Sequence, residues 1–194
     1  VLAIDLGATR ATIAVADLAG HILSSHSRAL DIADGPEAVL DEVLREGAQL
    51  MAHGGLEAST LLGVGIGVPG PVEHSTGRPT NPPIMPGWDR FDVPGAVQRT
   101  FAVPVLVDND VNILALGEHA RSWPRVDDLI FVKVATGIGA GIISGGALQR
   151  GAQGSAGDMG HVQVPYSHDS PREHGDECDL EAIASGSALA ATLT

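Results

Sequence analysis

The sequence predicts an α/β fold in which short apolar strands run into polar or glycine-rich loops and amphipathic helices follow. The stretch 105–107 is a run of three strand-forming apolar residues that leads directly into a polar cluster at 108–112 and then a helical pattern. The 25 glycines gather in loops after apolar runs rather than in low-complexity tracts. Hydrophobic residues make up 44% of the chain and aromatic residues only 3%, so the core must consist mainly of Ala, Val, Ile and Leu.

Length, charge and cysteine content limit the classes of protein to which this chain can belong. The 194 residues suffice for one large domain or two small lobes, and a net charge of −13 makes the chain by itself a poor nucleic-acid binder. The single cysteine, Cys178, excludes a disulfide framework and fits a reducing cytoplasm. We expect no membrane span and no signal peptide. The start in a strand without Met and the helical pattern at 185–194 indicate a fragment of a longer protein.

The first part of the chain begins with a predicted hairpin. Strands are predicted at 1–4, 11–16 and 21–25, and the first of them is a short apolar run. In the first turn, Asp5-Leu-Gly-Ala-Thr-Arg10, Gly7 lets the backbone approach a ligand, and Thr9 with exposed N–H groups can hold phosphate oxygens. Asp5 can face a magnesium ion. An ordinary hairpin with a polar turn explains the same residues, so this motif alone is weak evidence for a phosphate site.

A scaffold helix and another strand follow the hairpin. Pro36 suits a first helical turn, and apolar residues recur at helical spacing from there to Met51. The apolar run 61–68 predicts a buried strand, which ends in the rigid loop Pro69-Gly-Pro71. Backbone N–H groups in such a loop can face a ligand.

The next segment is long and stiffened by prolines. Loops of this length are often functional, and Asn81 within 76–88 is a candidate ligand contact, whereas we expect Trp88 to belong to the core. A short helix is predicted at 95–101 and a strand at 103–107.

The polar cluster Asp108-Asn-Asp-Val-Asn112 is the central candidate site. Ligand groups in parallel α/β sheets lie at the carboxyl ends of strands, where this cluster stands. Its two carboxylates and two amides can hold a polyhydroxylated ligand, because each group donates or accepts in fixed directions. A carboxylate there can also take a proton from a hydroxyl as a general base. The alternative is a strand-to-helix turn with an Asx cap.

The second part of the chain has its own glycine hairpin. We place the lobe boundary near the charged break at 121–128, which gives domains 1–120 and 121–194. A strand at 129–134 leads through Ala135-Thr-Gly-Ile-Gly-Ala-Gly141 into more apolar residues. This turn is similar in kind to the first one, and two such turns that face each other can clamp a polyphosphate.

Taken together, these motifs resemble the ROK family, which is named for repressors and sugar kinases. The phosphate loop of that family, D-x-G-G-T-K, is similar to Asp5-Leu-Gly-Ala-Thr-Arg10, and its catalytic loop, N-D-x-N, matches Asn109-Asp-Val-Asn112. Its sugar loops match at Val68-Pro-Gly70 and from Asn81 to the Pro-Gly-Trp that follows. The glycine-rich course from Gly137 to Gly157-Asp-Met-Gly-His161 resembles the family signature.

The resemblance implies an actin-like ATPase (ribonuclease H-like) fold with two lobes around a sugar and ATP cleft, the second lobe being incomplete. It implies that Asp110 is the catalytic base facing the hexose 6-hydroxyl as that oxygen attacks the γ-phosphoryl group of ATP. The implied sugar-binding residues are Gly70, Asn81, Asn109, Asp110, Asp158, His161 and Glu181. The implied residues for ATP and Mg²⁺ are Asp5, Gly7, Thr9, Arg10, Thr136 and Gly137.

The sequence departs from the kinase pattern in the phosphate loop, at Asp158 and in the zinc-binding segment. Ala8 and Arg10 replace the usual Gly and Lys, and the methyl group of Ala8 limits how closely a phosphate approaches. Asp158 stands where the family usually has Glu. The zinc-binding segment C-x-C-G-x-x-G-C-L-E reads Arg172-Glu-His-Gly-Asp-Glu-Cys-Asp-Leu-Glu181, which lacks the Cys cluster. A metal-free loop is therefore expected, and the alternative is a rebuilt zinc site made of His161, His174 and Cys178 or Asp179.

Three functions follow from this pattern. The first is the hexose-binding domain of a ROK-type transcriptional regulator whose helix-turn-helix segment precedes Val1, and the altered phosphate loop favours it. The second is a glucokinase-like, ATP-dependent hexose kinase, favoured by Asp110 and Thr136-Gly137. The third is a degenerate lobe that binds neither ligand. The first two predict a hexose or amino-hexose ligand, DNA contact only through a segment outside this chain, and a homo-oligomer.

Overall fold

The computed structural model describes residues 1–164 and 179–192. The chain divides into two compact units, Val1–Asp110 and Val111–Thr194. The division falls at the start of helix α3 (Asp110–Ser122), one helix before the 120/121 boundary expected from the sequence. Within the described part of the chain, no helix is both long enough and apolar enough to cross a membrane.

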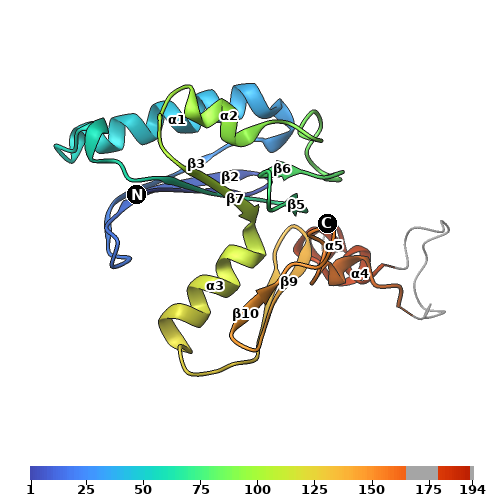
Figure 1. The fold of residues 1–194 in the computed structure, drawn as a ribbon. Helices are drawn as coiled ribbons and strands as arrows, with labels where there is room; N and C mark the ends of the chain where they lie inside the picture. The colour runs from blue at the N-terminus through green and yellow to red at the C-terminus, as the bar shows by residue number, and fades with distance from the viewer. Residues whose placement is uncertain (165–178, 193–194) are drawn as a thin grey trace. The chain divides into compact units, whose positions relative to one another are not determined.

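A five-stranded mixed sheet with the order β3-β2-β1-β4-β7 forms the basis of the first unit (Figure 1). Its strands are β1 (Leu2–Leu6), β2 (Arg10–Ala16), β3 (Ile22–Ala29), β4 (Val64–Val68) and β7 (Val105–Asn109). The first three pair antiparallel, whereas β1 with β4 and β4 with β7 pair parallel, with Ile66 opposite both Ile4 and Val107. The carboxyl ends of β1, β4 and β7 therefore meet at one edge of the sheet.

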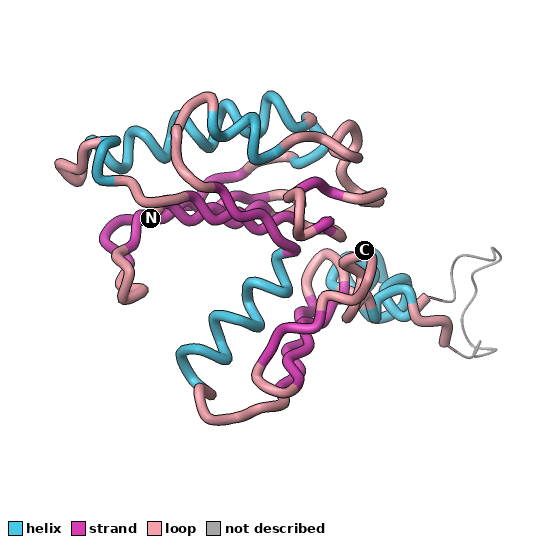
Figure 2. The backbone as a smooth tube through the Cα atoms, in the orientation of Figure 1, coloured by secondary structure: helices cyan, strands magenta, loops and turns pink. Residues whose placement is uncertain are grey.

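Two helices cover one face of this sheet (Figure 2). Helix α1 (Pro36–His53) begins with proline and buries Val39, Leu40, Val43 and Leu44, at the spacing expected for a core-facing stripe. Gly47 lets this helix lie close to β1, since a Cβ there would stand 2.8 Å from a methyl carbon of Leu2. Helix α2 (Val93–Gln98) begins earlier than the predicted 95–101, because the Asp92 carboxylate caps it by accepting from the Gly95 N–H at 3.1 Å.

Trp88 lies in the core of the first unit, as the sequence predicted. Its side chain is fully buried, and its ring packs edge-on against Phe91 with a centroid distance of 6.2 Å. The indole Nε1–H donates to the Ile32 carbonyl oxygen at 3.1 Å, so the polar atom of the ring is satisfied. Trp88 therefore ties the long proline-rich loop to the short 3₁₀ helix Ile32–Asp34.

Most boundaries differ from the predicted ones for local reasons. Strand β3 runs on to Ala29, because a polar edge strand has no apolar alternation to mark its end. Strand β4 starts only at Val64, after the 3₁₀ turn Ala58–Thr60. Strand β7 passes directly into α3 at Asp110, so the polar cluster is divided between a strand and a helix with no loop between them.

A small hairpin that the sequence did not predict lies in the first unit. It consists of β5 (Val72–Glu73) and β6 (Arg78–Pro79), with Val72 opposite Pro79. Two-residue strands are too short to show a period of two, so no pattern in the sequence marked them.

The second unit contains α3 and a three-stranded antiparallel sheet with the order β10-β9-β8. Its strands are β8 (Leu129–Val134), β9 (Ile138–Ser144) and β10 (Ala147–Gln149), followed by the 3₁₀ helix Met159–His161, α4 (Leu180–Ala184) and α5 (Gly186–Thr192). Helix α3 packs closely on β9, because a Cβ on Gly141 would stand 2.8 Å from the Val111 carbonyl oxygen. Glycine in β9 therefore permits this contact.

The two tryptophans give a matched test of the core. We expect Trp88→Ala to lower the free energy of unfolding by about 3–5 kcal/mol, because it removes a buried ring and leaves a cavity. Trp123→Ala removes a ring that is 52% exposed, and we expect a change within about 0.5 kcal/mol. Urea unfolding followed by circular dichroism measures both, and equal losses in the two variants would contradict the assignment of Trp88 to the core.

Candidate functional site

Three of the predicted sugar-binding residues of the first unit gather at the carboxyl edge of its parallel strands. Val68, the last residue of β4, lies opposite Asn109 of β7. The Asn109 side-chain amide donates to the Gly70 carbonyl oxygen at 3.0 Å, which fixes the orientation of that amide. Gly70 also lets the Asn81 loop approach, since a Cβ on Gly70 would stand 2.9 Å from Cβ of Pro82.

Asn81 holds an unusual backbone conformation beside this edge. Its φ of 44° lies in the left-handed region, which asparagine tolerates better than most residues. Its backbone N–H donates to the Asp89 carboxylate at 2.8 Å, and the neighbouring Thr80 N–H donates to the Pro71 carbonyl oxygen at 3.0 Å. The loop is thus fixed on both sides of Asn81, whose side chain is exposed.

A network of charged side chains braces the β5–β6 hairpin that leads to Asn81. Arg90 also has a positive φ, 58°, and its guanidinium lies 3.1 Å from the Glu73 carboxylate. Arg78 donates to the Arg90 carbonyl oxygen at 2.9 Å and pairs with Asp92 at 3.1 Å. A hydrogen bond from Thr76, together with the charges of the two arginines, lowers the pKa of the Glu73 carboxyl.

Asp110, the predicted base, is the first residue of α3 and only 5% exposed. A carboxylate at a helix N-terminus interacts favourably with the helix dipole. Asp108, two residues earlier, is buried as well. The structure thus contains two buried carboxylates at the end of β7, an arrangement that needs hydrogen-bonding partners or ligands.

Of the residues predicted to bind ATP and Mg²⁺ in the first unit, Gly7 and Thr9 lie in the turn between β1 and β2, whereas Asp5 belongs to β1 and Arg10 begins β2. The Gly7 N–H donates to the Arg10 carbonyl oxygen at 2.8 Å and closes the turn. The carbonyl oxygens of Ala8 and Thr9 accept from the N–H groups of Ile32 and Leu30, at 3.0 and 3.1 Å. The segment after β3 therefore holds the turn in place through these two backbone hydrogen bonds.

In the second unit, Glu181 of α4 joins the predicted phosphate turn to the glycine-rich segment. Its carboxylate accepts from the Ile138 N–H at 2.7 Å. A Cβ on Gly137 or Gly160 would stand 2.6 or 2.7 Å from Glu181 Oε2, so both glycines leave space for this carboxylate. The Thr136 carbonyl oxygen accepts from the Ser187 hydroxyl at 2.8 Å, which ties the same turn to α5.

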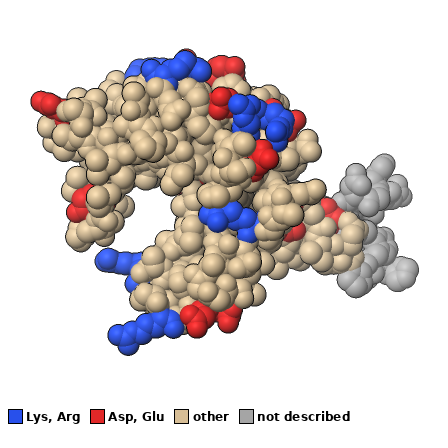
Figure 3. All heavy atoms as spheres, viewed as in Figure 1, with Lys and Arg blue, Asp and Glu red and all other residues tan. Residues whose placement is uncertain are grey.

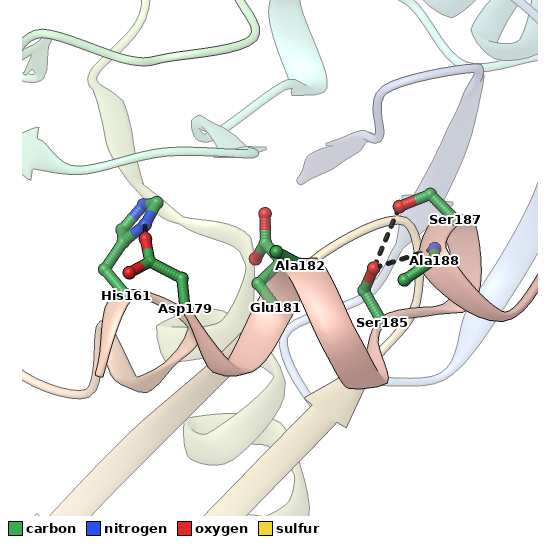
Figure 4. A pocket seen from close by; sticks show the side chains of 7 residues that line it. All are labelled: His161, Asp179, Glu181, Ala182, Ser185, Ser187 and Ala188. Atoms are coloured by element: carbon green, nitrogen blue, oxygen red, sulfur yellow. Dashed lines mark hydrogen bonds and ion pairs between the residues drawn. The ribbon is translucent and has the colours of Figure 1, made fainter. Parts of the chain in front are cut away.

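His161 lies between two aspartates in this unit, and Figure 4 shows its ring beside Asp179. Nδ1 of His161 lies 3.3 Å from Asp179 Oδ2, and Nε2 lies 3.8 Å from Asp158 Oδ1. The hydrogen bond with Asp179 is the main cause of a raised pKa for His161, and the charges of Asp158 and Glu181 add to it, whereas burial opposes them.

These side chains line a cavity of about 360 Å³ in the second unit (Figure 4). Its lining residues are His161, Asp179, Glu181, Ala182, Ser185, Ser187 and Ala188. No ligand role was predicted for the two serines. The feature of the sequence that could have indicated them is a Ser-Gly-Ser stretch at the start of a helix. In the structure, the Ser185 hydroxyl accepts from the Ala188 N–H at 3.2 Å.

The zinc alternative falls mainly outside the described residues. His174 and Cys178 belong to 165–178, for which the structure gives no description. Over 1–164 and 179–192, no cluster of three or more His, Cys, Asp or Glu side chains is arranged to hold a metal ion. Of the proposed zinc ligands, His161 and Asp179 are the two that fall within the described residues.

Charged groups are mixed on the surface. On the face drawn in Figure 3, lysine and arginine side chains form small separate groups, several with acidic neighbours, and no continuous basic patch. This distribution agrees with the net charge of −13 and does not resemble a nucleic-acid-binding face.

The comparisons with known proteins include both repressors and kinases. The chain is 32% identical to the xylose repressor of Caldicellulosiruptor bescii over 170 residues, which are 87% of the chain and 42% of that repressor. A ROK family transcriptional regulator, a homologue of the E. coli MLC protein, matches with a TM-score of 0.82 and 26% identity over 99% of the chain and 48% of that protein.

A ROK family glucokinase from Streptomyces griseus, solved with glucose and AMPPNP, matches with a TM-score of 0.80 and 30% identity over 97% of the chain and 58% of the enzyme. The chain thus spans about half the length of each of these relatives. The predicted α/β fold of the actin-like ATPase type is confirmed by these structures. The ROK family model matches residues 1–194, so the chain belongs to the ROK family.

Proposed function

We propose that the chain is the hexose-binding domain of a ROK-family transcriptional regulator that controls genes of carbohydrate metabolism. The observation that carries this proposal is a contrast within the first unit. At the strand ends, the Asn109 amide is held against Gly70 beside the Asn81 loop, as a sugar site requires. In the phosphate turn, Ala8 and Arg10 depart from the kinase pattern.

A sensor must bind a hexose but need not hold a phosphate, which agrees with this difference between the strand ends and the phosphate turn. The hydrogen bond to Gly70 fixes the plane of the Asn109 amide, a group that can exchange hydrogen bonds with sugar hydroxyls. The carboxylate of Asp110 can accept from a second hydroxyl, and Asp158, His161 and Glu181 are the proposed sugar contacts of the second unit. A ligand held in this way shifts a conformational equilibrium by its differential affinity for the two states, and no phosphoryl transfer is needed.

The similarity to a xylose repressor and to a solved ROK regulator supports this proposal. DNA contact would come from a helix-turn-helix segment outside the described chain, since the chain itself carries a net charge of −13. A cytoplasmic location and a homo-oligomer remain expectations from the sequence.

The second candidate is an ATP-dependent hexose kinase, and the position of Asp110 favours it. Asp110 is a buried carboxylate at the end of β7, and such a group can take the proton of a sugar hydroxyl as a general base. The 30% identity with a glucokinase solved with glucose and AMPPNP supports the same role. Thr9, Thr136 and Gly137 would then line the phosphates and Asp5 would hold Mg²⁺, which neutralises phosphate charge.

The two candidates are separated by one pair of measurements on the full-length protein that contains this chain. We expect calorimetry with a hexose panel to detect binding, and a coupled assay to detect no ATP-dependent phosphorylation. Asp110→Asn should weaken hexose binding about tenfold, because it removes a charged acceptor. Turnover in the wild type that disappears in Asp110→Asn would instead establish the kinase and reject the pure sensor.

Asn81 offers a test in which stability and binding separate. We expect Asn81→Gly to leave the free energy of unfolding within about 1 kcal/mol of wild type, because glycine adopts a φ of 44° without strain, and to weaken hexose binding. Asn81→Ala loses the same amide and also adds backbone strain, so it should lower both quantities. Hexose affinity that is unchanged in Asn81→Gly would show that the amide is not a sugar contact.

His161 gives a test in the second unit by NMR titration of protein treated with EDTA. We expect Asp179→Asn to lower the pKa of His161 toward its usual value, because it removes the main stabilising partner of the imidazolium. Asp158→Asn should lower the pKa less, since that contact is longer, 3.8 Å against 3.3 Å.

The raised pKa also links His161 to stability. Its contribution is fully present below the pKa of the unfolded chain and is lost as pH rises through the higher folded pKa, so Asp179→Asn should flatten stability over that interval. An unchanged pKa of His161 in Asp179→Asn would contradict the assigned cause.

A further inference from the structure

We propose that His74 is a positioning residue for the sugar loop of the first unit and acts through Asp108 on Asn109. The inference rests on the proposed hexose site and adds to it a residue that no motif identified. It is drawn from four residues that follow one another in space, namely His74, Asp108, Asn109 and Gly70.

Asp108 is a buried carboxylate. This residue lies in β7 opposite Gly67 of β4 and is only 6% exposed. A carboxylate at such a place is stable only when its oxygens have partners. Oδ1 accepts from the Asn109 backbone N–H at 2.8 Å, and Oδ2 lies 3.4 Å from Nδ1 of His74.

Hydrogen bonds brace the turn that carries His74. The Gly77 N–H donates to the Glu73 carbonyl oxygen at 2.8 Å, and the Thr76 hydroxyl donates to the Glu73 carboxylate at the same distance. The hairpin lies against β7, since a Cβ on Gly77 would stand 3.3 Å from a methyl carbon of Val107. His74 is therefore presented to Asp108 from a braced turn rather than from a free loop.

Asn109 connects the His74–Asp108 pair to the sugar loop. The backbone N–H of Asn109 is held by Asp108, and its side-chain amide is held by Gly70, so both ends of Asn109 are fixed. With a proton on Nδ1, His74 can interact favourably with the Asp108 carboxylate, 3.4 Å away. Loss of this contact would weaken the hold on the Asp108 carboxylate, and the orientation of Asn109 that a sugar hydroxyl needs would be less well fixed.

The test compares His74→Ala with His74→Asn, because the Asn side-chain nitrogen occupies nearly the place of imidazole Nδ1. The matched control is His26→Ala, which removes a histidine of β3 that lies 3.0 Å from Glu46 and at the opposite edge of the sheet from β7. Two readouts are taken on each variant: hexose affinity by calorimetry, and the exchange rate of the Asn109 amide hydrogens by NMR, with thermal melting to confirm folding.

We expect His74→Ala to weaken hexose binding about tenfold and to speed exchange at Asn109, while His74→Asn restores both and His26→Ala changes neither. Wild-type affinity in His74→Ala would overturn the proposal. Equal weakening in both His74 variants with unchanged exchange at Asn109 would also overturn it, because the imidazole would then act on the sugar directly. If the wild type binds no hexose, the proposed function fails, and the exchange at Asn109 alone decides the role of His74.

Discussion

The parallel pairing of β4 with both β1 and β7 is the constraint on which the first unit depends. It places Ile4, Ile66 and Val107 side by side in the core, and it brings three carboxyl ends to one edge of the sheet. A slip of one residue between β4 and β7 would move Ile66 off its core neighbours and separate Val68 from Asn109. The apolar register that stabilises the sheet therefore also determines where the Asn109 amide meets the Gly70 carbonyl oxygen.

The second unit positions its polar groups differently, through backbone contacts that only glycine permits. A side chain at Gly137 or Gly160 would occupy the space of the Glu181 carboxylate, and one at Gly157 would collide with the Ala140 carbonyl. Since aromatic residues make up only 3% of the chain, few large side chains are present to build a cavity wall. Close backbone approach around Glu181 takes their place, and the cavity beside His161 and Asp179 is the result.

Sequence reasoning predicted those parts of the fold that have a local pattern. Strand β8 was predicted at its observed bounds, and Trp88 was assigned correctly to the core. Both features can be recognised from the local sequence alone, as an apolar run and as a tryptophan after a proline-rich loop. The β5–β6 hairpin and the approach of His74 to Asp108 have no such pattern, since they depend on strands that are distant in sequence.

The candidate site shows the same division. Motif resemblance selected Gly70, Asn81 and Asn109, and the structure brings them together at one strand edge. Motif resemblance could not show that Asp179 is the partner of His161. From the sequence, this aspartate was only a possible replacement for a zinc-binding cysteine. The left-handed backbone of Asn81 was also invisible, since asparagine adopts either sign of φ depending on its surroundings.

Sensing and phosphoryl transfer place different demands on the turn between β1 and β2. Transfer needs the γ-phosphoryl group held in line with the sugar hydroxyl, so the backbone must approach phosphate closely at that turn. Here the carbonyl oxygens of Ala8 and Thr9 accept hydrogen bonds from the segment after β3. These bonds restrict the turn, so its backbone has little freedom to shift and make room for a phosphate beside the methyl group of Ala8. A sensor makes no such demand, because it needs only a difference in hexose affinity between two conformations. The hydrogen bonds around Asn109 serve either function, so the phosphate turn is the part of the first unit that favours a sensor.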